Sequence, residues 1–330
     1  MANVAIFVPH NGCPNKCSFC DQRHITGFVT QPDAKFVEDT LKTALSSLKE
    51  KSKDAEIAFF GGSFTAIDRD YMLSLLESTK PYINDFKGIR ISTRPDAIDE
   101  SILSILKDYK VTSIELGAQS MDDDVLAANQ RGHNSDDVKN ASKLIKSYGF
   151  SLGLQMMTGL YTSSDDKDLY TACEFIKLCP DTIRIYPTVV LKNTTLADLY
   201  REGVYNPPEC DNASKLCSKL IPMFEAEGIK VIRVGLHDSE SLRDNMIAGA
   251  FHPAFRELCE SQIYLDNILN EIKSQNLKGG DIEIKVSKSG LSKAIGQRCS
   301  NKNTLINMGY KPKFSVNDTL AERQVLITKG

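Results

Sequence analysis

Short runs of hydrophobic residues alternate along the chain with longer amphipathic segments. Six runs bounded by Gly, Pro or polar residues are typical of buried strands, and they span residues 4–9, 56–60, 89–93, 113–117, 151–156 and 182–187. Segments whose apolar side chains recur every three or four residues predict helices at 34–49, 70–81, 99–109, 135–148 and 166–178. A further helix at 212–227 and a strand at 229–234 follow them. Strand and helix therefore alternate through the first two thirds of the chain.

This alternation favours parallel strands joined by crossover helices. We expect an α/β fold in which residues 1–236 form a partial (β/α)6 barrel similar to a TIM barrel and residues 237–330 form a small α+β C-terminal domain. In the second region the pattern predicts helices within 246–275 and a strand at 282–286. Active sites of parallel barrels lie at the carboxyl ends of the strands, so the residues that follow each run are the first candidates for function.

Composition excludes several classes of protein. The 330 residues are 41% hydrophobic and 25% charged, close to the average of globular proteins, which excludes a disordered, collagen-like or coiled-coil chain. The apolar runs are far shorter than the ~20 residues of a membrane helix, and the first nine residues lack the pattern of a signal peptide. We therefore expect a cytoplasmic protein without a membrane partner.

Charge is distributed unevenly. The net charge of −3 argues against a protein that coats nucleic acid with its whole surface. Residues 273–313 nevertheless hold eight Lys and one Arg against two carboxylates, a local net charge of +7. Such a stretch is either the solvated surface of a small domain or a face that contacts phosphate groups.

Three of the nine cysteines, Cys13, Cys17 and Cys20, follow the first predicted strand with the spacing C-x3-C-x2-C. Without an export signal we expect reduced thiols rather than a disulfide framework. Soft thiolates at this spacing bind zinc or an iron-sulfur cluster. A structural zinc ion needs a fourth protein ligand, for which His24 is available, and an inert group of thiols is a third interpretation. The position at the functional end of a predicted barrel favours the iron-sulfur cluster.

The three cysteines, with the aromatic Phe19 directly before Cys20, resemble the cluster motif of the radical S-adenosylmethionine (SAM) superfamily. The resemblance implies a [4Fe-4S] cluster held by these cysteines, with one iron left open for SAM. It also implies that the reduced cluster cleaves SAM and generates a 5′-deoxyadenosyl radical, which abstracts a hydrogen atom from the substrate. A reductant protein of the flavodoxin or ferredoxin type is then an expected partner.

Two further segments resemble SAM-binding segments of the superfamily. Gly61, Gly62 and Ser63 resemble the Gly-Gly-Glu sequence whose backbone meets the SAM amino group, with a hydroxyl in place of the carboxylate. Residues 91–96 resemble the Glu-Thr-Arg-Pro-Asp sequence of the Elongator catalytic subunit. Ser92 stands where relatives carry an acidic residue that hydrogen-bonds the SAM ribose, so we expect a contact from its hydroxyl or from elsewhere.

Residues 116–120 and the downstream Arg131 resemble residues of the oxygen-independent coproporphyrinogen oxidases and of the Elongator catalytic subunit. That resemblance implies that Gln119 and Arg131 hold the methionine moiety of SAM. Arginine suits this task because its planar fork pairs with a carboxylate.

The resemblance favours an Elongator-like branch of the superfamily without the acetyltransferase domain, because fewer than a hundred residues follow Val234. It implies a hydrogen-abstracting enzyme whose first candidate substrate is an anticodon uridine of tRNA. A small metabolite or a tetrapyrrole is the second candidate. The alternative from another class is a non-catalytic, zinc-stabilised RNA-binding module. The oligomeric state does not follow from the sequence.

Overall fold

The computed structural model describes residues 2–9, 13, 16–21 and 30–329. The chain divides into two compact units, one formed by residues 1–209 and 223–250 and the other by 210–222 and 251–330. The expected domain boundary after residue 236 stays a prediction.

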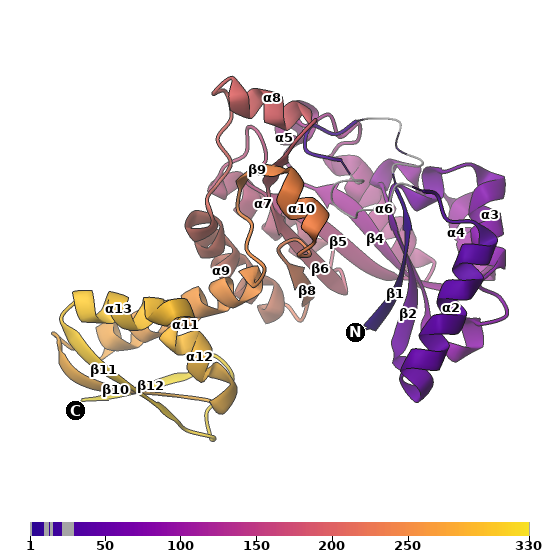
Figure 1. The fold of residues 1–330 in the computed structure, drawn as a ribbon. Helices are drawn as coiled ribbons and strands as arrows, with labels where there is room; N and C mark the ends of the chain where they lie inside the picture. The colour runs from indigo at the N-terminus through magenta and orange to yellow at the C-terminus, as the bar shows by residue number, and fades with distance from the viewer. Residues whose placement is uncertain (1, 10–12, 14–15, 22–29, 330) are drawn as a thin grey trace. The chain divides into compact units, whose positions relative to one another are not determined.

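The first unit is built on a seven-stranded sheet in the order β1-β2-β3-β4-β5-β6-β8 (Figure 1). Every neighbouring pair in this sheet is parallel. The strands are β1 (Ala2–Val8), β2 (Ala55–Gly61), β3 (Gly88–Thr93), β4 (Val111–Gln119), β5 (Ser151–Thr158), β6 (Thr182–Pro187) and β8 (Lys230–Val234). The sheet curves into a half-barrel, so the expected α/β fold class is confirmed.

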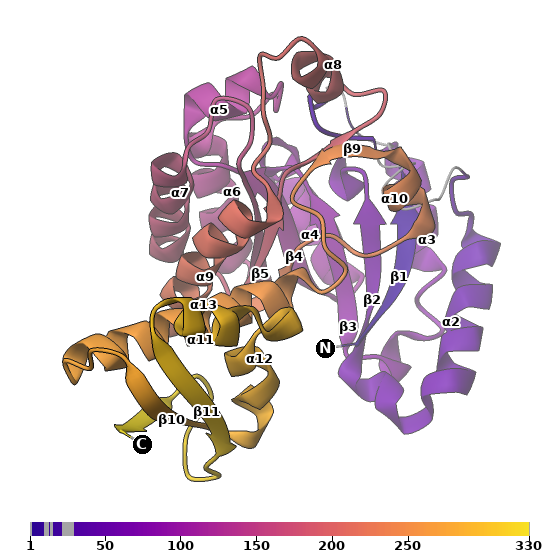
Figure 2. The same ribbon diagram turned by 60° about the vertical axis from the view of Figure 1, so that its left-hand side comes forward.

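Five helices connect consecutive strands and lie on the outer face of the sheet (Figure 2). They are α2 (Ala34–Leu48), α3 (Arg69–Glu77), α4 (Glu100–Asp108), α6 (Ser135–Ser147) and α7 (Asp165–Lys177). Each begins after an Asp, Asn or Ser whose side chain accepts a hydrogen bond from a backbone N–H of the first turn, which fixes where the helix starts. Among the described helices, none has the length and apolar composition needed to cross a membrane.

The two faces of the sheet have opposite character. Outward-facing positions are apolar and fully buried, as at Ile57, Ile91 and Leu116. Burial of this surface against the helices supplies the hydrophobic stabilisation of the unit. The alternate positions of the same strands point to the inner face, and several of them are charged.

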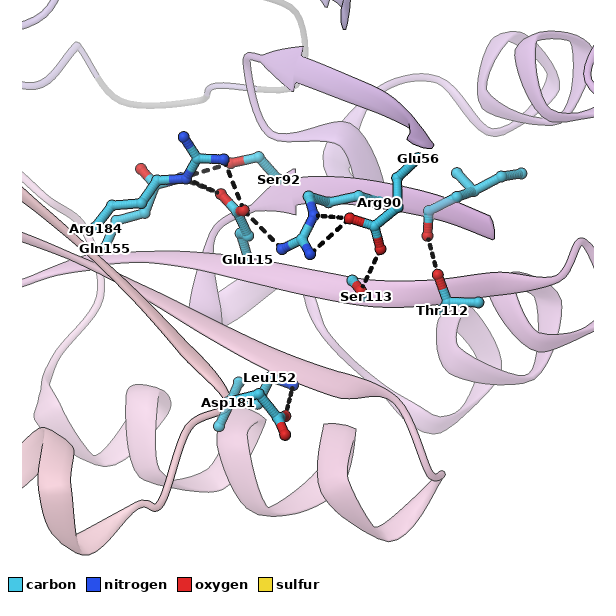
Figure 3. A network of polar contacts seen from close by, with 11 residues as sticks. Glu56, Arg90, Ser92, Thr112, Ser113, Glu115, Leu152, Gln155, Asp181 and Arg184 are labelled. Atoms are coloured by element: carbon cyan, nitrogen blue, oxygen red, sulfur yellow. Dashed lines mark hydrogen bonds and ion pairs between the residues drawn. The ribbon is translucent and has the colours of Figure 1, made fainter. Parts of the chain in front are cut away.

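A row of buried ion pairs crosses the inner face (Figure 3). Arg90 on β3 donates from Nε to Glu56 Oε2 at 2.7 Å and from Nη1 to Glu115 Oε1 at 2.8 Å. Arg184 on β6 donates from Nε to Glu115 Oε2 at 2.7 Å, and Ser113 donates to Glu56 Oε1 at 3.0 Å. The side chains of Arg90, Glu56 and Glu115 are at most 3% exposed, so each charge depends on its partners.

Smaller elements complete the first unit. They are α5 (Asp123–Ala128), α8 (Thr195–Arg201), α10 (Glu240–Asn245) and the antiparallel pair of β7 (Val189–Leu191) and β9 (Met246–Gly249). The helix expected to begin at residue 246 was wrong there, because these residues pair with β7. Gly249 has a φ of +107°, outside the range of a right-handed helix, and a Cβ on it would lie 2.6 Å from the Thr188 carbonyl oxygen, so this position requires glycine.

The second unit is a small α+β fold, as expected. Its sheet has the order β11-β10-β12, with β10 parallel to β11 and antiparallel to β12. The elements are α11 (Phe255–Ser274), β10 (Gly280–Val286), α12 (Leu291–Ile295), α13 (Ser300–Asn307), β11 (Tyr310–Val316) and β12 (Val325–Lys329). Tyr264, Ile284 and Leu305 are fully buried in its core. A long helix, α9 (Cys210–Ala226), contributes residues to both units.

We predict that Arg90→Met lowers the free energy of unfolding by about 3–5 kcal/mol, because the buried Glu56 and Glu115 carboxylates lose their shared cation. Denaturant unfolding followed by circular dichroism measures the change. Arg69→Met, at an exposed position of α3, is the matched control and should alter stability by less than about 0.5 kcal/mol. Equal stability of the two variants would contradict the role given to the ion pairs.

Candidate active site

The carboxyl ends of β1 and β2 lie against each other. Gly62 donates its backbone N–H to the Val8 carbonyl oxygen at 2.8 Å. Gly61 has a φ of +115°, and a Cβ on it would lie 2.8 Å from the same oxygen. A glycine is therefore required at Gly61 for steric reasons. The close approach brings the segment after β2 to Cys13, the first described residue of the cysteine loop (residues 13 and 16–20).

The three cysteine thiols lie within electrostatic reach of one another. Partial loss of solvent, followed by the neighbouring Cys17 thiol, raises the pKa of Cys13, while a hydrogen bond from the Ser63 backbone acts in the opposite direction. Burial, followed by Cys17 and Cys13, raises the pKa of Cys20 to about 12. Ionisation of these thiols therefore costs free energy, and a bound metal centre would lower that cost because it deprotonates the thiols that coordinate it.

The three thiols can be compared with the ligands of a single metal ion and with those of an iron-sulfur cluster. Within the described ranges, no three Cys, His, Asp or Glu side chains converge as the ligands of a single ion do. A four-iron cluster binds each cysteine at a different iron, so its ligand sulfurs stand further apart than those around one ion. Three thiol donors suit the soft metal of an iron-sulfur cluster or of a zinc site. His24, the fourth ligand of the zinc alternative, lies outside the described residues.

Ser18 and Asn129 anchor the cysteine loop. Neither residue was among those predicted from the sequence. Both residues are fully buried. Ser18 donates from Oγ to Asn129 Oδ1 at 2.7 Å, and from its backbone N–H to the Asn129 carbonyl oxygen at 3.1 Å. The Asn129 amide donates in turn to the carbonyl oxygens of Val125 and Tyr161, at 2.8 and 2.9 Å. One buried amide therefore ties the loop to α5 and to the segment after β5.

Phe19 secures the other side of the loop. Its ring packs against a hydrophobic cluster that includes Val190, Leu196 and Tyr205. The neighbouring Ser18 carbonyl oxygen accepts a hydrogen bond from the Leu196 backbone N–H at 2.8 Å. The aromatic residue of the motif is thus a packing anchor that holds the last cysteine in place.

Arg131 reaches the cysteine loop from the segment that follows α5. Its side chain donates from Nη1 to Cys17 Sγ at 3.0 Å and from Nη2 to the Gly117 carbonyl oxygen, and its guanidinium carbon lies 5.8 Å from the centre of the Phe19 ring. Arg131 is 6% exposed, and its Nε finds no hydrogen-bond partner among the described residues. A buried donor without a partner is a candidate for ligand contact.

Gln119 ends β4 in a conformation that is unusual for its residue type. Its φ is +69°, and the register of β4 with β5 shifts just before it. The side chain is 8% exposed, and Oε1 lacks a partner in the described part of the chain. Backbone strain together with a buried, unsatisfied acceptor is typical of a functional position.

Ser63 uses its side chain within the fold. Its hydroxyl lies 2.9 Å from Thr93 Oγ1 and accepts a hydrogen bond from the Arg94 backbone N–H at 3.1 Å. These contacts join the ends of β2 and β3. The side chain is therefore committed to the fold, and the backbone of Gly62 and Ser63 is what this segment can offer a ligand.

Ser92 lies on the inner face of the sheet, one residue before the end of β3. The Gln155 amide donates to Ser92 Oγ and to Glu115 Oε2, both at 3.2 Å (Figure 3). Ser92 is half-buried and belongs to the inner-face network. The other expected residues lie at the strand ends: Cys13, Cys17, Cys20, Phe19, Gly61, Gly62 and Ser63 around the loop, and Gln119 at the end of β4, where the Gly117 carbonyl oxygen accepts a hydrogen bond from Arg131.

Two family models and several known proteins match the sequence of this chain. The family model described as the radical SAM superfamily matches residues 7–175, and that of the radical SAM C-terminal domain matches residues 180–264. A tRNA uridine(34) acetyltransferase of Dehalococcoides mccartyi is 27% identical over 239 residues, covering 62% of this chain and 52% of that protein. Elongator complex protein 3 of Dictyostelium discoideum is 32% identical over 139 residues, covering 41% and 25%. The chain thus spans about half the length of the first relative and a quarter of the second.

Among solved structures, the archaeal Methanocaldococcus infernus Elp3 with an N-terminal deletion superposes with a TM-score of 0.62. It is 20% identical, and the superposition covers 84% of this chain and 63% of that one. This likeness concerns the fold. Together with the cysteine motif on the loop after β1 and a family model that spans half of the sequence, it establishes that the chain belongs to the radical SAM superfamily.

Proposed function

We propose that this enzyme holds a [4Fe-4S] cluster on Cys13, Cys17 and Cys20 and binds SAM beside it, at the ends of β2 and β4. When bound, the cluster and SAM would supply one-electron chemistry that removes a hydrogen atom from a substrate. The observation that carries the proposal is that three mutually interacting thiols occur with two buried polar atoms, Gln119 Oε1 and Arg131 Nε, that have no hydrogen-bond partner among the described residues.

The two unpartnered atoms have complementary chemistry. Gln119 Oε1 is an acceptor and suits an ammonium group, whereas the Arg131 Nε–H is a donor and suits a carboxylate. The methionine moiety of SAM carries both groups. The backbone of Gly62 and Ser63 would meet the same end of the ligand, and Ser92 on the inner face would supply a hydroxyl to the ribose.

For the substrate we propose RNA, with tRNA as the first candidate. The name of the Dehalococcoides relative supports this choice. So does the second unit, where Lys288, Arg298 and Lys302 are exposed and have no carboxylate partner in the part of the chain that the structure describes. Lys285 and Lys293 differ, because they pair with Glu283 at 3.4 Å and with Glu322 at 3.0 Å.

A one-electron donor is the second partner that the proposal needs, and a flavodoxin or ferredoxin type of protein fits the reaction class. A small metabolite or tetrapyrrole remains the alternative substrate. The exposed, unpaired cations favour RNA over it.

The first prediction concerns the cluster. Protein reconstituted without oxygen should bind close to four irons and lose its iron-sulfur absorbance under dithionite. Alanine at Cys13, Cys17 or Cys20 should abolish iron binding, whereas Cys173→Ala, at an exposed cysteine outside the loop, should retain it. Iron and zinc analysis of the four variants measures this. Stoichiometric zinc without iron-sulfur absorbance would refute the proposal and favour the zinc-stabilised module.

The second prediction concerns Gln119. Gln119→Asn keeps a residue type that tolerates a positive φ but withdraws the amide by one methylene. SAM affinity should fall roughly tenfold, or about 1.4 kcal/mol, through loss of a hydrogen bond to a charged group. Gln119→Glu keeps an acceptor at the same reach and should bind SAM at least as well as wild type. Titration of SAM into cluster-loaded protein is the measurement, and equal affinity of all three proteins would exclude Gln119 from the site.

The third prediction concerns RNA. Changing Lys288, Arg298 and Lys302 together to Glu should reduce the slope of log affinity against log salt for bulk tRNA by about two units, because fewer counterions are released. Changing Lys285 and Lys293, which already pair with carboxylates, to Gln is the matched control and should leave the slope close to wild type. Equal slopes for all three proteins would favour the small-molecule substrate.

A further inference from the structure

The turn after α5 contacts two consecutive residues of the cysteine loop. Asn129 binds Ser18 through side chain and backbone, and Arg131 binds the sulfur of Cys17. Gln130, between them, has a φ of +54°, which turns the chain so that both residues on either side of it face the loop. The central cysteine of the motif is therefore held by a segment more than a hundred residues away in sequence.

The guanidinium of Arg131 is fixed on several sides. Nη1 donates to Cys17 Sγ at 3.0 Å, Nη2 donates to the Gly117 carbonyl oxygen at the end of β4, and the Phe19 ring lies alongside. The side chain is buried and cannot turn to solvent without breaking these contacts. The contact to the Cys17 sulfur therefore belongs to a rigid set of contacts made by Nη1 and Nη2. It is separate from the contact to SAM that is proposed for Nε.

Among the described residues, Arg131 also brings to this rim a positive charge that no carboxylate pairs. Arg94, at the end of β3, is a second guanidinium that interacts electrostatically with Cys17 and Cys13, but it is paired with Asp96, with Nε and Oδ1 2.8 Å apart. Arg131 forms no ion pair with a carboxylate of the described residues. Its positive charge therefore lies beside the sulfur of Cys17.

We propose that Arg131 is a positioning residue for the cluster, which fixes Cys17 and raises the reduction potential through an N–H···S hydrogen bond and a nearby positive charge. This inference rests on the cluster of the proposed function. Hydrogen bonds to ligand sulfur and local charge are among the factors that set the potential of iron-sulfur clusters. Both stabilise the reduced form, because it carries one more negative charge.

The test measures the reduction potential of the cluster in the absence of SAM, so that loss of SAM binding does not enter. Arg131→Gln removes the charge and should shift the potential to a more negative value. Arg131→Lys keeps the charge but cannot bond Cys17 and Gly117 with the same planar fork, and should shift it less. Arg201→Gln, which removes an exposed arginine on α8 paired with Asp198, is the control and should leave the potential unchanged.

The outcomes separate the inference from the proposed function. Wild-type protein that takes up no cluster refutes the proposed function. If wild type is loaded and Arg131→Gln holds full iron at the wild-type potential, the inference is overturned. If Arg131→Gln is folded by circular dichroism but empty, the positioning role is supported and Arg131→Lys carries the test of the potential. A loaded Arg131→Lys at a more negative potential than wild type supports the effect of the N–H···S hydrogen bond, and one at the wild-type potential overturns it.

Discussion

Ionising three thiols on one short loop costs free energy. The residues that surround the cysteine loop in this protein act on that cost. Loss of solvent and mutual repulsion raise the pKa of Cys20 to about 12 and that of Cys13 above its usual value. A bound cluster would offset this cost directly, because a metal centre deprotonates the thiols that coordinate it. The protein also offsets part of it, through the hydrogen bond between the Ser63 backbone and Cys13 and through the positive charge of Arg131, which acts to lower the pKa of Cys13 and Cys20.

The half-barrel serves this arrangement through its two unlike faces. The outer face is apolar and packs against the helices that connect consecutive strands. The inner face is held together by the ion pairs of Arg90 with Glu56 and Glu115, and Gly153 leaves room for them, since a Cβ there would lie 2.8 Å from Glu115 Cγ. Because these contacts join β2 to β4, the ends of those strands bring Gly62 and Gln119 to the same rim.

Much of the fold was predictable because it depends on local periodicity. The eight expected strands begin and end within about two residues of those observed, and the cysteine spacing with Phe19 indicated the superfamily that the family model confirms. The anchors of the loop were not predictable. Ser18 and Asn129 are separated by 111 residues, and a buried Ser–Asn pair has no periodic signature. The strand at 246–249 was missed because its partner, β7, is distant in sequence and β pairing depends on tertiary context.

The proposed cluster on the three cysteines has one iron open to SAM. Electron paramagnetic resonance of the dithionite-reduced, reconstituted protein, recorded with and without SAM, is the direct test of this property. If SAM binds at the cluster itself, the reduced protein should give the signal of a [4Fe-4S] cluster, and this signal should change when SAM is added. A cluster signal that SAM leaves unchanged, or the absence of any iron-sulfur signal, would contradict it.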